Sequence, residues 1–273
     1  MSDKVSVHYS GGGELARKIA EGLQRAGKSL DGIETKDLAA IDEFHFRGRA
    51  ATLELAEKMR LSKDSKVLDI GSGLGGATRT LAEEYGCQVT GIDLTQEFCE
   101  AAAIMSGWVG LSDRTEFLQG DATNLPFAND RFEAAMTIHV AMNIAAKYEV
   151  YEQARRVLKP GGVFAVYDIL QGEGGEAYYP APWARDSSIS HLASTNEMEE
   201  YLSNAGFRIT EIQDSTDESL RWLETRATSG SDQVSPPFTT QILFGDIFPE
   251  MTRNQIFGLR ERRIRTVSFF CEA

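Results

Sequence analysis

The feature that most constrains the fold of this chain is a glycine-rich stretch that joins an apolar run to a helical pattern. Residues 67–81 read VLDIGSGLGGATRTL, and residues 76–86 then continue with helical spacing. Glycines after a strand permit a tight turn and a close approach of backbone to ligand, and the next helix offers free N–H groups. The stretch therefore predicts a buried strand, a ligand-binding loop and a helix, in that order.

The same alternation of strand and helix continues along the chain. Helical patterns occupy residues 95–110 and 147–162, and the apolar runs that alternate with them lie at 87–94, 114–122, 131–140 and 163–170. This alternation is typical of a mostly parallel, Rossmann-like sheet with helices on both faces. In such sheets ligands bind outside the carboxyl ends of the strands.

The C-terminal third predicts a different ending for the sheet. A helix at 188–207 precedes a strand at 207–214, and a polar segment then leads to a helix at 245–264 and a seventh strand at 266–273. An irregular or helical connection before this last strand permits an antiparallel pairing. We expect one α/β unit, with residues 1–60 as an N-terminal helical cap and residues 61–273 as the main domain.

The composition narrows the classes of partner. The 273-residue chain has a formal net charge of −13, which disfavours nucleic acid and anionic membranes. No apolar run approaches the ~18 residues of a membrane-spanning helix, and no apolar signal core opens the chain. Cys87, Cys99 and Cys271 match no metal or redox motif. We expect free thiols in a reducing cytoplasm, and no bound metal.

The glycine loop raises the question of which cofactor it holds. Gly71-x-Gly73-x-x-Gly76, with Asp93 about 20 residues further on, fits the fingerprint of a dinucleotide-binding enzyme. Asp69, two residues before the first glycine, would repel a pyrophosphate but would suit an ammonium or sulfonium group. A further carboxylate, Asp121, follows the third strand. Three carboxylates near one ligand favour a cationic adenosine compound over a dinucleotide.

Five motifs in order carry a resemblance to a known family. VLDIGSGLGGAT, VTGIDLT, GDATNLPF, FEAAMTIHV and RVLKPGGVFAVYDI, between Lys66 and Asp168, resemble the successive motifs of class I S-adenosylmethionine-dependent methyltransferases. That family has a seven-stranded sheet with a reversed last strand. The segments DEFHFRGRAATLELAEKM and IHVAMNIAAKYEVYEQA are most similar to the small-molecule enzymes of the sarcosine/dimethylglycine and ubiquinone/menaquinone-pathway groups.

The resemblance implies where S-adenosylmethionine would bind. Gly71, Gly73 and Asp69 would face its methionine part, Asp93 its ribose, and Leu94 its adenine. The remaining cofactor contacts that the resemblance implies are Asp121 and Ala122 at the adenine edge, Ile138 near the sulfonium, and Gly48 near the carboxylate.

The side chains expected near the methyl acceptor come from the fourth strand, the cap and the segment after the fifth strand. His139 ends the fourth strand, at the ligand-binding edge, and is our candidate for a catalytic base. An aromatic side chain in this region could hold a cationic amine or a flat ring. The other candidates for substrate contact are Phe44, His45, Met142, Asn143, Trp183 and His191.

The sequence thus predicts a methyltransferase that uses S-adenosylmethionine and acts on a small-molecule acceptor by in-line displacement. N-, O- and C-nucleophiles all stay open. Two alternatives also stay open: an NAD-dependent oxidoreductase, which rests on the glycine fingerprint alone, and a non-catalytic protein that binds S-adenosylmethionine.

Overall fold

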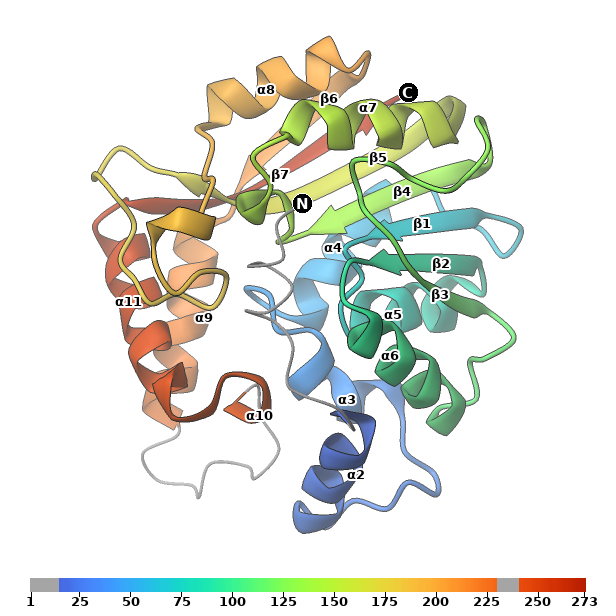
Figure 1. Ribbon diagram of the computed structural model, residues 1–273, viewed down its shortest axis with the longest axis vertical. Helices are drawn as coiled ribbons and strands as arrows, with labels where there is room; N and C mark the ends of the chain where they lie inside the picture. Colours follow the sequence, from blue (N-terminus) through green and yellow to red (C-terminus); the bar gives the residue numbers. More distant parts are fainter. Residues whose placement is uncertain (1–14, 230–240) are drawn as a thin grey trace.

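The centre of the molecule is a seven-stranded sheet in the order β3-β2-β1-β4-β5-β7-β6 (Figure 1). The computed structural model describes residues 15–229 and 241–273. The strands are β1 (Lys66–Ile70), β2 (Gln88–Asp93), β3 (Thr115–Gln119), β4 (Phe132–Ile138), β5 (Leu158–Gln171), β6 (Arg208–Asp214) and β7 (Ile264–Glu272).

The pairing of the strands confirms the predicted fold class. β1 pairs in parallel with β2 and with β4, and β5 continues the parallel arrangement beside β4. β7 is antiparallel to both of its neighbours, β5 and β6. The sheet is therefore Rossmann-like, mostly parallel, and reversed at its last strand, as the sequence predicts.

Helices cover both faces of the sheet. One face carries α4 (Arg49–Lys58), α5 (Gly76–Tyr85) and parts of α9 (Thr216–Ser229) and α11 (Phe248–Arg260). The other face carries α7 (Lys147–Val157) and α8 (Thr195–Asn204). The elements that complete the description are α2 (Leu15–Arg25), α3 (Thr35–Asp42), α6 (Gln96–Trp108), α10 (Gln241–Phe244) and the short 3₁₀ helices η1 (Ala141–Asn143), η2 (Ser187–Ile189) and η3 (Gly245–Ile247).

Three elements differ in detail from the prediction. The helix predicted at 188–207 begins only at Thr195, as α8. The polar segment after β6, in which no particular element is predicted, begins with the 14-residue helix α9. Asp214 Oδ1 accepts from the Thr216 N–H at its start (2.8 Å), and Ser219 and Leu223 turn toward the core. Helix α7 ends at Val157, before the predicted stop, because Leu158 already pairs with Phe132 of the sheet.

The N-terminal helices dock on the glycine loop through a close backbone approach. A Cβ added to Gly76, the first residue of α5, would lie 2.4 Å from the carbonyl oxygen of Asp42, so this position must lack a side chain. Beside it, Asp42 Oδ2 accepts from Arg79 Nη2 (2.6 Å) in a buried ion pair. This contact brings the segment after α3 over the carboxyl ends of the strands.

Candidate functional site

A cavity lies at the carboxyl ends of the central strands. About 1120 Å³ of space, part of it open to solvent, lies between the atoms that line it. Most of the predicted site residues line it: Phe44, His45, Asp69, Gly71, Gly73, Asp93, Leu94, Ala122, Ile138, His139, Met142, Asn143 and Trp183.

The glycine loop is anchored to the end of β2. The N–H groups of Gly71 and Ser72 donate to the carbonyl oxygen of Ile92, at 2.7 and 3.1 Å. Gly71 has a φ of +78°, and an added Cβ would lie 2.3 Å from Val140, so only glycine fits here. The loop thus packs closely against the ends of β2 and β4, and Gly71, Ser72 and Gly73 line the cavity.

Asp69 is a buried carboxyl group at the floor of this loop. Its Oδ2 accepts from the hydroxyl of Thr78 (2.6 Å), and no Lys or Arg among the described residues pairs with it. Burial raises the pKa of Asp69 to about 7, and the nearby carboxylates of Asp93 and Glu43 act in the same direction. A carboxyl group in this state gains a strong partner if a cation enters the cavity.

Asp93 ties the glycine loop to the start of α6. Its Oδ2 accepts from the Gly73 N–H and its Oδ1 from the Thr95 N–H, each at 2.9 Å. Burial raises the pKa of Asp93, while these two hydrogen bonds oppose the rise. Each carboxylate oxygen has a second lone pair, so Asp93 can still accept from the hydroxyl groups of a ligand.

His139 combines a strained backbone with an unpartnered ring nitrogen. Its φ is +54°, in the left-handed region that residues other than glycine rarely adopt. Its Nε2 is buried and has no hydrogen-bond partner among the described residues. The ring packs at centroid distances of 4.9 Å from Tyr167, 5.3 Å from Phe46 and 5.8 Å from His45. Burial, and then the charges of His45 and Arg47, hold the pKa of His139 well below its ordinary value.

His45 presents a neutral ring of defined tautomer. Its Nε2 lies 3.0 Å from the Gly48 carbonyl oxygen, which can only accept, so Nε2 carries the proton and Nδ1 keeps its lone pair. Burial lowers the pKa of His45 to about 4. The cavity is thus flanked by two imidazoles that both stay neutral at physiological pH.

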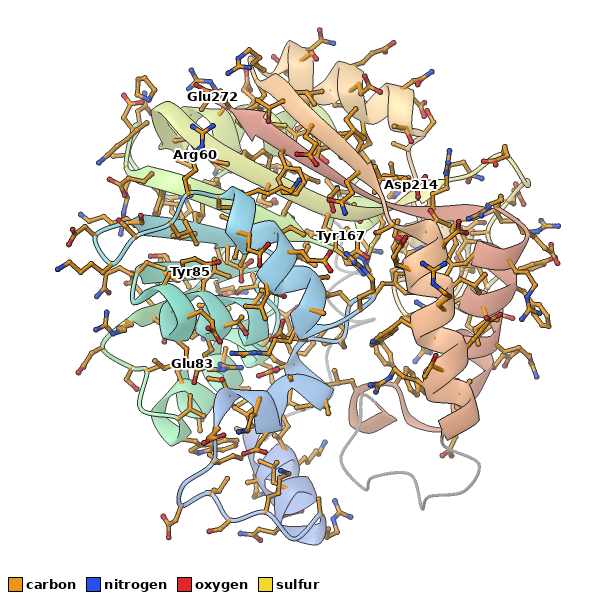
Figure 2. All side chains as sticks on the ribbon, turned by 180° about the vertical axis from the view of Figure 1, so that it is seen from behind. Arg60, Glu83, Tyr85, Tyr167, Asp214 and Glu272 are labelled. Carbon is orange, nitrogen blue, oxygen red and sulfur yellow. The ribbon has the colours of Figure 1, made fainter. Side chains whose placement is uncertain are left out.

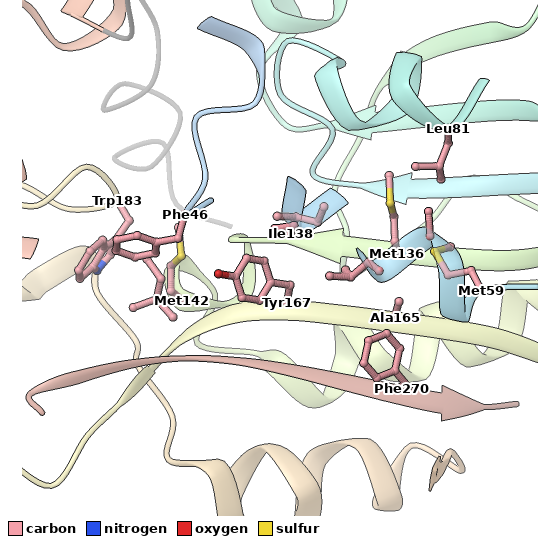
Figure 3. Close-up of a cluster of buried hydrophobic side chains, with 14 of the residues drawn as sticks. Phe46, Met59, Leu81, Met136, Ile138, Met142, Ala165, Tyr167, Trp183 and Phe270 are labelled. Carbon is pink, nitrogen blue, oxygen red and sulfur yellow. The ribbon is translucent and has the colours of Figure 1, made fainter. Parts of the chain in front are cut away.

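The wall opposite the glycine loop is largely apolar. Trp183, Met142 and Phe46 gather at one end of the buried cluster, next to Tyr167 (Figure 3). Trp183 and Met142 also line the cavity, whereas Phe46 belongs to the core. An acceptor at this wall would meet aromatic and thioether groups.

Three predicted residues do not line the cavity. Gly48 caps α4 and holds His45 through its carbonyl group. Asp121 turns to Thr123, whose N–H and hydroxyl both donate to its Oδ1 (2.8 Å). His191 hydrogen-bonds through its backbone to Met142. A ligand contact at these three positions stays a prediction.

Ten residues that line the cavity are not among the predicted site residues, and four of them show the different reasons. Val140 follows His139 directly, and Thr95 follows Asp93 and Leu94, so both could be found by extending the strand-end motifs. Asp42 and Gln255 come from α3 and α11. No local signal marks these two, because only the packing of those helices brings them to the cavity.

No helix among the described residues is long and apolar enough to cross a membrane. Within residues 15–229 and 241–273, no group of three or more His, Cys, Asp or Glu side chains is arranged to hold a metal ion. The three cysteines are free and buried.

The sequence matches to known proteins include strands of the central sheet. Residues 68–166 match the family model described as a methyltransferase domain. The sterol 24-C-methyltransferase ERG6B of Gibberella zeae is 38% identical over 116 residues, which cover 42% of this chain and 30% of that protein. The chain spans between 30% and 50% of the length of the first curated relatives that it matches.

Two solved structures share the fold over most of the chain. Phosphoethanolamine N-methyltransferase 2 of Haemonchus contortus, in complex with S-adenosyl-L-methionine, has a TM-score of 0.72 at 20% identity and covers 93% of this chain and 59% of that one. The [4+2]-cyclase SpnF has a TM-score of 0.67 at 20% identity and covers 95% and 97%.

The matched domain extends from β1 to β5 and includes the glycine loop, Asp69, Asp93 and the start of the acceptor wall. The strand order and the reversed β7 agree with the sheet that the resemblance implies. Residues 68–166 therefore match a methyltransferase domain, within a sheet whose fold is shared with solved methyltransferase structures.

Proposed function

We propose that this protein binds S-adenosylmethionine and transfers its methyl group to a small-molecule acceptor. The observation that carries the proposal is Asp69, a buried carboxyl group beneath a glycine loop with no cationic partner among the described residues. A dinucleotide would bring a pyrophosphate to this carboxyl group, whereas S-adenosylmethionine brings an ammonium group. The matched methyltransferase domain supports the same choice.

The residues of the cavity fit the successive parts of this cofactor. Asp69 and the backbone of Gly71 and Gly73 would hold the amino-acid end, and Asp93 would accept from the ribose hydroxyls. Leu94 and Ala122 would enclose the adenine, as the cavity lining allows. The cofactor supplies an activated methyl group on a sulfonium, which is a good leaving group.

In such a displacement the protein would position the two reactants and exclude water from them. Holding two reactants in line can lower a barrier by roughly 7–11 kcal/mol. Ile138, Met142 and Trp183 line the cavity with apolar surface that excludes water. His139 is placed to accept a hydrogen bond or a proton from the nucleophile, since its buried Nε2 has no partner among the described residues.

The side chains on the acceptor side indicate the class of acceptor. His45 and His139 are neutral, and Trp183 and Met142 are apolar. We propose an acceptor that is largely apolar, that carries no phosphate or carboxylate at this wall, and that donates a hydrogen bond near His139. The strongly negative net charge supports a small molecule over nucleic acid.

Two further expectations belong to this proposal. Phe44 and His45 reach the cavity from the N-terminal segment, which supports residues 1–60 as a cap of the same unit as residues 61–273. The three free cysteines support a reducing cytoplasm as the compartment.

Calorimetry with S-adenosylhomocysteine tests the cofactor assignment directly. We expect saturable binding at micromolar concentration, and a matched titration with NADH is expected to show none. Binding of NADH with no response to S-adenosylhomocysteine would instead support the oxidoreductase alternative.

A screen for methylated products, with labelled S-adenosylmethionine and neutral apolar acceptors, tests the transfer itself. We expect label to enter at least one acceptor. Normal cofactor binding without label in any small-molecule or protein acceptor would support the non-catalytic alternative.

A further inference from the structure

The segment that carries Trp183 has little regular structure of its own. Residues 181–191 contain one isolated bridge between Ala181 and Ala184 and the single-turn helix η2. Yet Trp183 is only 1% exposed, and Pro182 and Trp183 both line the cavity. Contacts from outside the segment must therefore hold it in place.

Asn143, at the end of η1, supplies two of these contacts. Its Nδ2 donates to the carbonyl oxygen of Trp183 at 2.7 Å and to that of Ile189 at 2.9 Å. Both amide protons are thus engaged by the backbone of the segment. Asn143 lines the cavity, but its amide nitrogen positions the wall and has no N–H left for an acceptor molecule.

Lys147, at the start of α7, supplies the next contact. Its side chain is buried, and its Nζ donates to the carbonyl oxygens of Ile144 (2.7 Å) and His191. The His191 N–H in turn donates to the carbonyl oxygen of Met142 (2.7 Å). A buried ammonium held mainly by carbonyl groups is costly, so its presence here indicates a specific task.

The charged groups around Lys147 come from two neighbouring elements. Asp168 of β5 and Glu197 of α8 both favour the charged form of Lys147. The backbone N–H groups of Ala141 and Met142, at the start of η1, favour the charged form of Asp168. Lys147 and η1 are therefore anchored at the central sheet, and residues 181–191 are the segment that they hold.

Resting on the proposed function, we propose that Asn143 and Lys147 are positioning residues that form a polar clamp and set the place of Trp183 at the acceptor wall. The clamp acts on the shape of the acceptor side and leaves the cofactor side, with Asp69 and Asp93, untouched. Its loss should free Trp183 while binding of S-adenosylhomocysteine persists.

The environment of Trp183 gives a direct readout that does not need an acceptor. In a Trp108→Phe/Trp222→Phe background, Trp183 is the remaining tryptophan, and acrylamide quenching of its fluorescence reports its exposure. Asn143→Asp keeps the side-chain shape but opposes two carbonyl groups with a carboxylate, and Lys147→Met keeps the chain length but removes the donor.

We expect each variant to raise the quenching constant of Trp183 at least about threefold and to shift its emission to longer wavelength, because a held segment becomes mobile. Affinity for S-adenosylhomocysteine is expected to stay within about threefold, since no cofactor-side contact changes. Val89→Ala, a buried substitution near the start of β2 and away from the cavity at the carboxyl ends of the strands, is the control for general destabilisation.

The outcomes separate the clamp from the proposed function. The clamp would be overturned if Asn143→Asp and Lys147→Met lower Tm, as Val89→Ala does, while the quenching constant of Trp183 stays unchanged. Loss of S-adenosylhomocysteine binding in these variants, with Trp183 still shielded, would also overturn it. If the unmodified protein fails to bind S-adenosylhomocysteine, the proposed function fails, but the quenching result still decides the clamp.

Discussion

At the scale of single residues, we expect Asp69 to link cofactor binding to proton release. Its pKa is about 7 in the free cavity, and a bound ammonium group stabilises the charged form and lowers that pKa. At pH 6.5 we expect S-adenosylhomocysteine to release about half a proton or more on binding. Calorimetry in buffers of different ionisation enthalpy measures this number.

The control for this prediction is 5′-methylthioadenosine, which lacks the amino-acid end of the cofactor. It should bind without the proton release. Asp69→Asn should abolish the difference between the two ligands and weaken S-adenosylhomocysteine about 10–100-fold, as expected for a lost charged hydrogen bond. Equal proton release by both ligands would contradict the assignment of Asp69.

His139 is the residue whose replacement should separate turnover from binding. His139→Asn is the suitable variant, because asparagine tolerates the φ of +54° better than alanine does. We expect turnover of an identified acceptor to fall at least about 10-fold, while affinity for S-adenosylhomocysteine changes less than about threefold. Unchanged turnover would remove His139 from the reacting centre.

At the scale of elements, a buried ion pair joins the end of α3 to α5. Asp42 pairs with Arg79, whose Nη2 also donates to the carbonyl oxygen of Leu74 (2.5 Å) and whose Nη1 donates to that of Ala102 (3.0 Å). Arg79→Met leaves the Asp42 carboxyl group buried without its cation. Urea unfolding should show a loss of ~3–5 kcal/mol, as when one partner of a buried pair is removed.

The matched variant is the double replacement Asp42→Leu/Arg79→Met, which removes both charges. It should recover a substantial part of the stability lost in Arg79→Met, since no buried charge then remains. A double variant less stable than the single one would show that the ion pair does more than neutralise two buried groups.

The sequence predicts the central elements well and the periphery less well. Four of the strands from β1 to β5 end at an acid or directly before a glycine, and β4 ends directly before His139. These local signals are independent of the surrounding packing. The sequence analysis does not predict helix α9, because the apolar positions of this helix are few. Asp214 and the acidic first turn are nevertheless ordinary signals for the start of a helix. Gln255 reaches the cavity only through the packing of α11, which no local pattern encodes.

The candidate site likewise has features that the sequence predicts and features that it does not. The sequence predicts Asp69 and Asp93 as site residues because the ends of their strands are marked in the chain. It does not predict the structural role of Asp93. Its two oxygens hold the N–H groups of Gly73 and Thr95. Asp93→Ala would therefore disturb the loop as well as any ribose contact. Asp93→Asn would also disturb it, because an amide group has one acceptor oxygen for two backbone N–H groups.

At the scale of the whole molecule, buried acids should shape the pH dependence of stability. Burial raises the pKa of Asp42 to about 6 and those of Asp69 and Asp168 to about 7. These acids hold more protons in the folded chain than in the unfolded chain between pH 4 and 7, so their contribution makes stability fall as pH rises through this range. Burial lowers the pKa values of His45 and His139, which opposes this trend but involves fewer groups. Above pH 8 the pKa of Lys147, lowered to about 8, and the raised pKa values of the three buried thiols act in opposite directions.

We therefore expect the ligand-free protein to be more stable at pH 5.5 than at pH 7.5, by about 2 kcal/mol. Thermal unfolding across this range measures the trend, and Asp69→Asn should reduce it. A Tm that rises between pH 5.5 and 7.5 would contradict the states assigned to these acids.

The position of β7 has a consequence for how the protein is made. Strands β1 to β5 pair with one another from residues 66–171 alone, but β6 touches the sheet only through β7 (Figure 1). In Figure 2, Asp214 lies at the end of β6 and Glu272 on β7, far apart in sequence but in adjoining strands. During synthesis, β6 leaves the ribosome without a partner and must wait some fifty residues for β7. In that interval its edge and the helices that will cover it are open to chaperones and to other nascent chains.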